Sequence, residues 1–391
     1  MSHTPAETVA STLPERAKAL RPLLEEQAPA SEQKGELTRE TVEALHRERL
    51  FAIWVPRELG GWELDPISSI GTIEELTYAD PSVGWVVMAA ALSTGTAGAY
   101  LGDEAVGQLF ARGKNPVIAG QGSRPGTAIA EDGGHRISGN WSFASGLLHS
   151  SHIHTAALVE GTNERRIFVL PVDQAELLGN WDVMGLRATG SIDYRIDDLF
   201  VPEPFSHSAA IGIGLRGGPV YTIGLIGFAS IGHTSWALGI ARRLLDELIS
   251  MVHEKAGRAG AQGQSESFLE ELETHEGRVR ASRSLTFEIW HDVWATVERG
   301  DALTRRQQTL IRLAMTHATS AADGAAEFAY HRAGTVALRR GRMQQLFRDM
   351  HAGSQHGFVA PATRINVARE LAGLADDKRW LFLQLADAVA E

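Results

Sequence analysis

The sequence predicts an α+β protein with an N-terminal α-helical domain, a middle β-domain and a C-terminal helical bundle. Apolar residues at helical spacing dominate both ends of the chain. Short runs of β-branched and aromatic residues, punctuated by Gly and Pro, fill the segment between them. We therefore expect three domains in the 391-residue chain, covering residues 1–112, 113–210 and 211–391.

In the first domain, we expect two amphipathic helices followed by a buried one. Residues 37–50 have apolar side chains near helical spacing, and Thr38 is a plausible N-cap. A second helical stretch covers residues 67–78, and Asp80-Pro81-Ser82 then begins another helix. Residues 85–100 are apolar and rich in Ala, Gly, Ser and Thr, so this helix should pack closely against another backbone.

The middle domain is expected to be a compact sheet or barrel. Residues 154–160, 165–172 and 192–202 look like strands, and Gly-rich turns separate the runs of this region. The last domain has apolar stripes within residues 238–252, 279–297 and 310–321. Long amphipathic helices with short breaks predict an antiparallel bundle, with a polar, glycine-rich hinge at residues 257–267.

Composition narrows the function classes. The formal net charge is −11, from 37 basic and 48 acidic residues, and no basic stripe stands out, so we expect neither a nucleic-acid nor a membrane partner. The chain has no cysteine, which removes disulfides, thiolate metal sites and cysteine nucleophiles. No apolar run long enough to span a bilayer and no signal peptide is recognisable, so we expect a cytoplasmic protein.

Motif searches exclude several classes of enzyme. The chain lacks HExxH, GxSxG, a Walker loop and the Rossmann GxGxxG, which argues against zinc hydrolases, serine hydrolases, kinases and classical dinucleotide enzymes. His149, His152 and His154 lie close together, but no nearby carboxylate completes a ligand set, and we predict no metal site.

Two stretches carry possible chemistry. Residues 139–146 (GNWSFASG) combine aromatic residues with hydroxyls that suit a flat heteroaromatic ring, although aromatic residues in a strand are usually core. Residues 346–356 (LFRDMHAGSQH) follow a long helix and carry two histidines. Here a loop delivering a titratable His to a cleft competes evenly with an ordinary helix end whose Arg348 and Asp349 make local contacts.

Five segments, in order, resemble the acyl-CoA dehydrogenase superfamily and, more narrowly, its two-component flavin-dependent monooxygenase branch (group D). They are LFAIWVPRELGGWELDP, ADPSVGWVV, GHRISGNWSFASGLLHSSH, MGLRATGSIDYRIDDLFVPEPF and RDMHAGSQH. The resemblance implies an acyl-CoA dehydrogenase-like fold with a middle β-barrel or sheet domain and a C-terminal four-helix bundle. It also implies a flavin between the β-domain and the bundle, and a homotetramer.

The superfamily contains dehydrogenases and oxygenases, and the sequence favours an oxygenase over a dehydrogenase. A dehydrogenase needs a carboxylate base, which many members carry just after the "RD" segment, but residues 352–356 hold none. Glu370 looks like a helix-surface residue, and a base elsewhere, such as Glu254, stays open. The superfamily's "RxxFG" segment for FAD is also missing, which favours FMN slightly over FAD.

For the oxygenase, the resemblance assigns catalytic roles to Ser145 and His356. They would supply hydrogen bonds near flavin N5 and to a flavin C4a-hydroperoxide. Trp141 and Phe143 would form a wall along the ring, and strand alternation predicts that both share a face with Ser145. Two further flavin contacts, at the pyrimidine edge, are expected from Gln121 and Ser123.

We therefore expect a reduced-flavin-dependent monooxygenase, a hydroxylase or an N-/S-oxygenase, that acts on a small organic substrate. It would use reduced FMN or FAD and dioxygen, with a separate flavin reductase because no nicotinamide fingerprint is visible. Phenol-hydroxylating relatives carry a histidine where this chain has residues 89–93 without one, which argues against a phenol. The alternatives are an acyl-CoA dehydrogenase-like FAD oxidoreductase and a catalytically dead scaffold.

Overall fold

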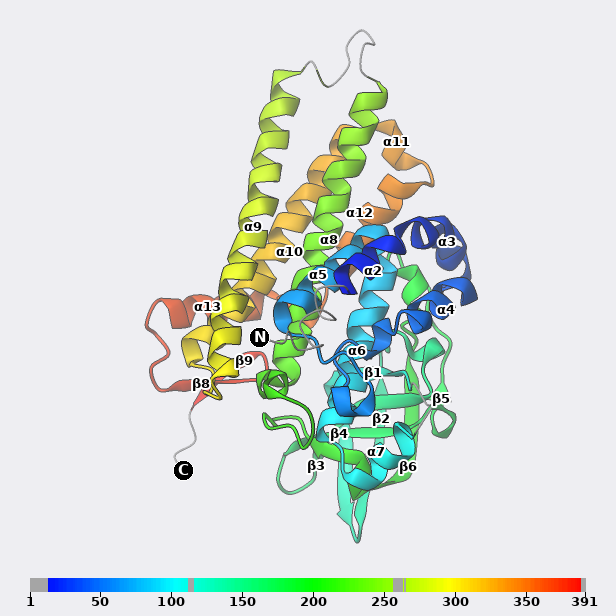
Figure 1. The fold of residues 1–391 in the computed structure, drawn as a ribbon, viewed down its shortest axis with the longest axis vertical. Coiled ribbons are helices and arrows are strands. Elements are labelled where there is room, and N and C mark those ends of the chain that lie inside the picture. The colour runs from blue at the N-terminus through cyan, green and yellow to red at the C-terminus, as the bar shows by residue number, and fades with distance from the viewer. Residues whose placement is uncertain (1–12, 112–115, 256–262, 264, 388–391) are drawn as a thin grey trace, which may run out of the picture.

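The computed structural model describes residues 13–111, 116–255, 263 and 265–387, and within strand β1 it leaves the side chain of residue 123 undescribed. Helices from both ends of the sequence pack together beside a β-sheet (Figure 1). The expected order of helices, then strands, then helices is confirmed. The N-terminal helices are α2 (Leu13–Ala19), α3 (Arg21–Lys34), α4 (Arg39–Arg47), α5 (Pro66–Ala79), α6 (Pro81–Tyr100) and α7 (Asp103–Leu109).

Local sequence signals explain where these helices begin. Thr38 caps α4 by accepting a hydrogen bond from the Thr41 backbone N–H, as predicted. Asp80 caps α6 by accepting from the backbone N–H of Ser82 at 3.0 Å. Small residues let α6 pack closely, because a Cβ at Gly84 would lie 2.0 Å from the hydroxyl of Thr77 on α5. The prediction of a buried, closely packed helix is confirmed.

The middle region folds into a mixed seven-stranded sheet with the strand order β5-β6-β2-β1-β3-β4-β7. β1 and β3 run parallel, and the other neighbouring strands are antiparallel. The strands are β1 (Ile118–Glu131), β2 (Gly134–Trp141), β3 (His152–Val159), β4 (Arg165–Pro171), β5 (Glu176–Leu177), β6 (Tyr194–Pro202) and β7 (Ser206–Ser208).

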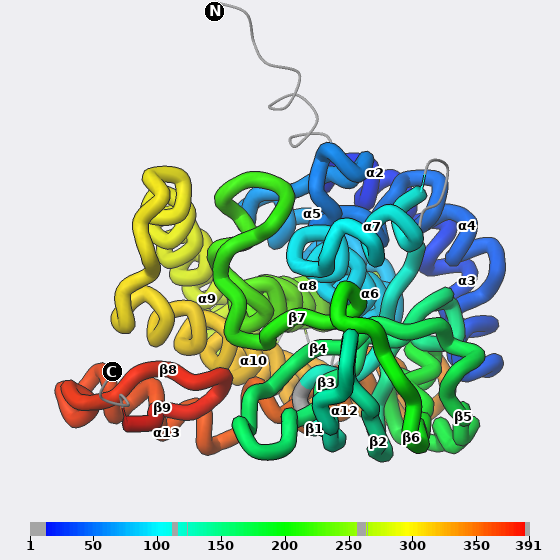
Figure 2. The backbone as a smooth tube through the Cα atoms, turned by 90° about the horizontal axis from the view of Figure 1, so that it is seen from below, coloured from blue at the N-terminus to red at the C-terminus, as the bar shows by residue number. Residues whose placement is uncertain are grey.

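The C-terminal helices form the second half of the molecule. α10 packs along both α8 and α9, as Figure 1 shows. A short hairpin, β8 (Lys378–Leu381) and β9 (Gln384–Asp387), was not predicted; it lies beside α13, on the opposite side of the molecule from β5 and β6 (Figure 2). The helices are α8 (Gly224–Glu254), α9 (Glu266–Glu298), α10 (Arg305–Ala333), α11 (Thr335–Leu338), α12 (Arg342–Gly353) and α13 (Pro361–Leu371).

The predicted hinge at 257–267 falls largely outside the described residues. Two helical stretches, Pro81–Tyr100 and Pro219–Glu254, are long and apolar enough to cross a membrane, contrary to the expectation from the sequence. In both, 89% of the apolar window is buried inside the protein. Their apolar side chains therefore lie in the interior of the fold, where α6 and α8 pack against each other.

Candidate active site

A cavity of about 580 Å³ lies where α6, the sheet, the start of α8 and the turn after α12 meet. Its volume falls in the range of about 300–1,000 Å³ that is usual for small-molecule sites. Most of the lining is apolar. Among the described lining residues, Arg124 is the one Arg or Lys, it is exposed, and no carboxylate is present.

Trp85 on α6 is the centre of the polar end of this cavity. Its indole N–H donates a hydrogen bond to the Ser145 hydroxyl at 3.0 Å. The imidazole rings of His233 and His356 lie on it edge-on, with centroid distances of 5.2 and 5.7 Å. One tryptophan therefore connects a loop of the β-domain to two histidines of the helical domain.

Three hydroxyls form a chain that starts at this tryptophan. The Ser145 Oγ lies 2.7 Å from the Ser191 Oγ, which in turn lies 2.7 Å from the Thr189 Oγ1. The Thr189 hydroxyl donates to the backbone carbonyl of Leu186, also at 2.7 Å. Ser145, Ser191 and Thr189 are buried, yet all three line the cavity. We call these three residues the hydroxyl wall.

The segment that carries two of these three hydroxyls, residues 184–191, is fixed to α12. The Leu186 N–H donates to the Asp349 Oδ1 at 2.6 Å, and the Arg348 guanidinium donates to the Met184 carbonyl at 2.7 Å. The approach is so close that a Cβ on Gly185 would lie 2.0 Å from the Arg348 carbonyl oxygen. Leu186 itself adopts a left-handed conformation, with φ of 53°.

This anchor corrects one of the alternatives drawn from the sequence. Arg348 and Asp349 do not make only local contacts at a helix end, because they connect the helical domain to the β-domain. Burial and, to a smaller extent, the nearby Asp80 carboxylate raise the pKa of Asp349 to about 7, although the hydrogen bond from Leu186 acts in the opposite direction. Oδ2 of Asp349 is buried and has no hydrogen-bond partner in the described part of the chain.

His233 on α8 and His356 in the turn after α12 form the opposite wall, which we call the imidazole wall. Their ring centroids are 4.2 Å apart. Burial lowers the pKa of His356 to about 4, and burial together with His356 lowers the pKa of His233 well below its usual range. Both rings are therefore neutral at pH 7.

The tautomer of His356 follows from its own turn. The Phe358 backbone N–H donates to the His356 Nδ1 at 3.3 Å, so Nδ1 carries a lone pair and the proton is on Nε2. A neutral imidazole of this kind is a hydrogen-bond donor on its outer edge. His356 can therefore donate to a group in the cavity without carrying a charge.

Two descriptions of known protein families match the sequence of this chain. The description "Acyl-CoA dehydrogenase, N-terminal domain" matches residues 16–110, and "Acyl-CoA dehydrogenase, C-terminal domain" matches residues 231–361. Together these two ranges cover more than half of the chain. The chain belongs to the acyl-CoA dehydrogenase family. The family and the fold predicted from the sequence are both confirmed.

Several similar proteins are oxygenases. The indole-3-acetate monooxygenase of Pseudomonas putida is 27% identical over 84% of this chain and 86% of its own. The flavin-dependent monooxygenase oxygenase subunit HsaA of Rhodococcus jostii is 24% identical over 89% of this chain and 94% of its own. XiaF from Streptomyces, solved with FADH2 and glycerol, superposes with a TM-score of 0.84 at 21% identity, over 94% of this chain and 97% of its own.

These relatives put the chain in the flavin-dependent monooxygenase branch of the family, as the sequence predicted. It is a flavin-dependent oxidoreductase, and a reduced flavin with dioxygen is the cofactor set of this branch. The residues in the cavity fit a flavin. The aromatic ring of Trp85, the hydroxyl wall and the neutral His356 ring all line the same cavity.

Two of the residues predicted from the sequence, Ser145 and His356, meet at this flavin-type cavity. Both contact Trp85, which sequence reasoning had assigned only to a buried helix. His233 was missed as well. The signal available for Trp85 was its place in the segment ADPSVGWVV, whereas the apolar context of His233 in α8 gave no indication of a site.

The predicted pyrimidine-edge contacts have mixed outcomes. Gln121 lines the cavity, and its side-chain oxygen accepts a hydrogen bond from the Arg124 backbone N–H at 2.9 Å. The side chain of Ser123 lies outside the described residues. Phe143 also lines the cavity but is 62% exposed, and it packs edge-on against Trp181. Phe143 is therefore placed to cover an opening of the cavity rather than to form its inner wall.

The prediction that Trp141, Phe143 and Ser145 share one strand face is wrong. Strand β2 ends at Trp141, and Phe143 has a φ of 67°, so alternation does not continue to Ser145. Trp141 instead stacks on Tyr194 in the interior of the β-domain, with ring centroids 5.3 Å apart, and donates to the Ala156 carbonyl. It is absent from the described cavity lining, so its assignment as a flavin wall is corrected.

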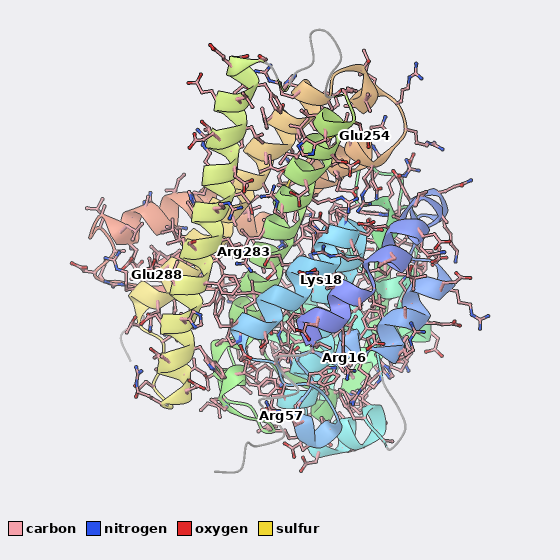
Figure 3. All side chains as sticks on the ribbon, turned by 45° about the horizontal axis from the view of Figure 1, so that its top comes forward. Arg16, Lys18, Arg57, Glu254, Arg283 and Glu288 are labelled. Atoms are coloured by element: carbon pink, nitrogen blue, oxygen red, sulfur yellow. The ribbon has the colours of Figure 1, made fainter. Side chains whose placement is uncertain are left out.

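The two carboxylates considered for a dehydrogenase base do not reach the cavity. Glu254 is exposed at the far end of α8 (Figure 3), and at about 1.5 Å of rise per residue the stretch from His233 is about 30 Å long. Glu370 is not a surface residue as predicted, because its side chain is buried and paired with Arg305 and Arg306. Neither can remove a proton from a substrate bound beside Trp85.

Proposed function

We propose that the cavity around Trp85 binds reduced flavin and a neutral, largely apolar organic molecule, and that the enzyme inserts one oxygen atom of dioxygen into that molecule. The observation that carries this proposal is the combination at one end of the cavity. Hydroxyls and a neutral imidazole N–H donor gather there, and the described lining holds no carboxylate. An α-proton abstraction, the step that a dehydrogenase needs, would have no base.

When bound, reduced flavin supplies the two electrons that activate dioxygen. The chain's own groups would then hold the ring and keep water away from it. Phe143 and Trp181 cover one opening, and Phe358 packs against both histidines at 4.9 and 5.2 Å. The Nε2–H of His356 would donate a hydrogen bond to an oxygen atom near the ring from an uncharged imidazole, because the low pKa of His356 disfavours the charged form.

The remaining lining suggests the chemistry of the substrate. Met88 and Leu92 of α6, Ile167 of β4 and Leu225 of α8 give an apolar chamber. A polar exception is His154, which lines the cavity and is uncharged at pH 7, because burial and the nearby His207 lower its pKa to about 3. We propose a flat substrate with a single hydroxyl or N–H group that meets His154. A histidine from β3 would thus stand in for the one that residues 89–93 lack.

As an oxygenase component, the protein would receive its reduced flavin from a separate reductase and act on a small molecule.

We also propose a cytoplasmic homotetramer. Support for assembly comes from apolar side chains exposed along α13 and the hairpin that follows it, Ile365, Leu374 and Leu381, which are 53%, 70% and 45% exposed. Analytical ultracentrifugation gives the assembly state directly, and a monomer at micromolar concentration would contradict the tetramer.

One set of binding experiments separates the proposed function from its alternatives. Photoreduced FMN or FAD should bind under anaerobic conditions more tightly than the oxidised flavin, and admission of air should oxidise the flavin. Acyl-CoA thioesters mixed with the oxidised flavoprotein should leave the flavin absorbance unchanged. Bleaching by a thioester would establish a dehydrogenase, and no binding of either redox state would indicate a scaffold.

A further inference from the structure

We propose that the hydroxyl wall is a one-way hydrogen-bond chain that leaves Ser145 able only to accept, so that the site selects reduced flavin through its N5–H. Trp85, Ser191 and Thr189 are then positioning residues that set the direction of Ser145. This inference rests on the proposed function, because it assumes that a flavin lies against Ser145.

The direction of the chain follows from counting hydrogens. A carbonyl oxygen can only accept, so the single hydroxyl hydrogen of Thr189 is used on the Leu186 carbonyl. Thr189 must therefore accept from Ser191, which uses the single hydrogen of Ser191. Ser191 in turn must accept from Ser145, 2.7 Å away.

At the other end, the indole N–H of Trp85 can only donate, and it occupies one of the two lone pairs of the Ser145 hydroxyl. The hydrogen of Ser145 is committed to Ser191, so what remains is one lone pair. Ser145 lines the cavity, and this lone pair is what it can offer to a ligand there. The sequence-based expectation that Ser145 donates to N5 is thereby reversed.

The consequence for a flavin depends on its redox state. Oxidised flavin presents a lone pair at N5, which would meet the lone pair of Ser145 without a hydrogen between them. Reduced flavin carries a hydrogen on N5 and can donate it to Ser145. A buried polar atom without a partner costs more than a hydrogen bond gains, so the chain penalises the oxidised form more than it rewards the reduced one.

The far end of the chain is held firmly enough to keep this direction. The Leu186 carbonyl, which sets the direction, belongs to the residue whose N–H is bound by Asp349 at 2.6 Å. A flip of the Leu186–Arg187 peptide group, which carries this carbonyl, would break the hydrogen bond that the Thr189 backbone N–H also donates to it at 3.1 Å. The polarity of Ser145 is therefore fixed by contacts that lie outside the cavity.

The test measures dissociation constants of oxidised and anaerobically reduced FMN and FAD, and the ratio of oxidised to reduced values for each. Ser191→Ala removes the acceptor for the Ser145 hydrogen, which can then turn to oxidised N5. The ratio should fall about tenfold, mainly because the oxidised flavin binds more tightly. The midpoint potential of the bound flavin should drop by about 30 mV, the two-electron equivalent of that factor.

Matched variants separate direction from structural damage. Thr189→Val frees the Ser191 hydrogen to turn toward Ser145 and should lower the ratio in the same sense. Ser235→Ala is the control, since this buried serine of α8 lies outside the described cavity lining and donates to its own helix at Ile231, and its ratio should stay within about twofold of the wild-type value. A merely structural role for Ser191 would weaken both redox states equally and leave the ratio unchanged.

Each outcome decides between the proposals. A wild-type protein that binds neither form of flavin overturns the proposed function and this inference with it. A wild-type protein that binds both forms equally, or a ratio unchanged in both Ser191→Ala and Thr189→Val, overturns the one-way chain alone. If one of these two variants does not fold, the other decides.

Discussion

The two walls that meet at Trp85 differ in how they use their hydrogens. The hydroxyl wall comes from loops of the β-domain, and every hydrogen in it is committed to a neighbour. The imidazole wall comes from α8 and the turn after α12, and there His356 keeps an N–H free of any described protein partner. One wall can only accept from a ligand, whereas the other can donate to it.

This difference indicates how a neutral site can still be polar in a defined direction. The described lining places no carboxylate near Trp85, and both histidines are uncharged at pH 7. The polarity of the site instead comes from the direction in which its hydrogen bonds point. Such orientation costs no buried charge, but it depends on exact placement of the segments that carry it.

The largest effect should come from a substitution that moves the segment of the hydroxyl wall away from α12. Gly185→Ala would put a Cβ 2.0 Å from the Arg348 carbonyl, so the segment 184–191 must move away from α12. We expect a loss of about 3 kcal/mol in the free energy of unfolding and loss of flavin binding. Denaturant unfolding and flavin titration measure both.

Gly277→Ala is the matched control for that variant. Gly277 lies in the exposed interior of α9 with open space around it, and alanine there should stabilise the protein by about 0.5–1 kcal/mol. Normal flavin affinity in Gly185→Ala would show that the segment does not need its close contact with α12.

Asp349→Asn tests the contact between Asp349 and the Leu186 N–H through the pH dependence of the free energy of unfolding. The folded-state pKa of Asp349 is raised to about 7 from its ordinary value of 3.8, so between these values the folded state binds more protons than the unfolded state. This group's contribution to stability is therefore fully present below pH 3.8 and is lost as the pH rises through about 7.

The asparagine keeps an oxygen for the Leu186 N–H but cannot ionise. At pH 8 we expect the variant to be more stable than the wild type by on the order of 2 kcal/mol, with the difference vanishing or reversing near pH 4. Urea unfolding across this pH range measures it. A difference that does not change with pH would contradict a raised pKa at Asp349.

His356→Ala breaks the imidazole wall. Loss of its Nε2–H should lower the fraction of reductant that appears as oxygenated product by about tenfold, with a matching rise in free hydrogen peroxide. His351→Ala is the control, because that histidine lies outside the described cavity lining and bonds Glu327 at 2.8 Å. Unchanged coupling in His356→Ala would remove His356 from the site.

The smallest effect is expected where a side chain belongs to neither wall. Trp141→Phe loses the hydrogen bond to the Ala156 carbonyl but keeps an aromatic ring against Tyr194. We expect a cost of about 1 kcal/mol in stability and unchanged affinity for flavin in either redox state. A selective loss of flavin affinity would restore the original assignment of Trp141 to the flavin wall.

The sequence predicted what depends on neighbours in the chain. The caps Thr38 and Asp80 and the buried character of α6 could be read locally. Ser145 and His356 came from the resemblance. The strand-face argument failed because it carried the alternation past the end of β2, where Phe143 has positive φ.

The rest of the site depends on contacts between distant segments. Nothing near Asp349 in sequence indicates that its partner is the backbone of Leu186, and nothing near Ser191 indicates a chain that ends at Trp85. Glu370 looked like a surface residue because its two arginine partners lie on α10. Such pairings become visible only once the domains are packed.

The anchor at Arg348 and Asp349 also has a consequence for how the protein is made. A ribosome releases the chain from its N-terminus, so Trp85 and all three hydroxyls of the wall emerge well before α12 does. During that interval the sheet can form, but the Leu186 N–H has no carboxylate to hold it. A nascent chain, or one truncated before residue 342, would therefore contain every hydroxyl of the wall and the Leu186 carbonyl, and still lack the carboxylate that holds their segment in place.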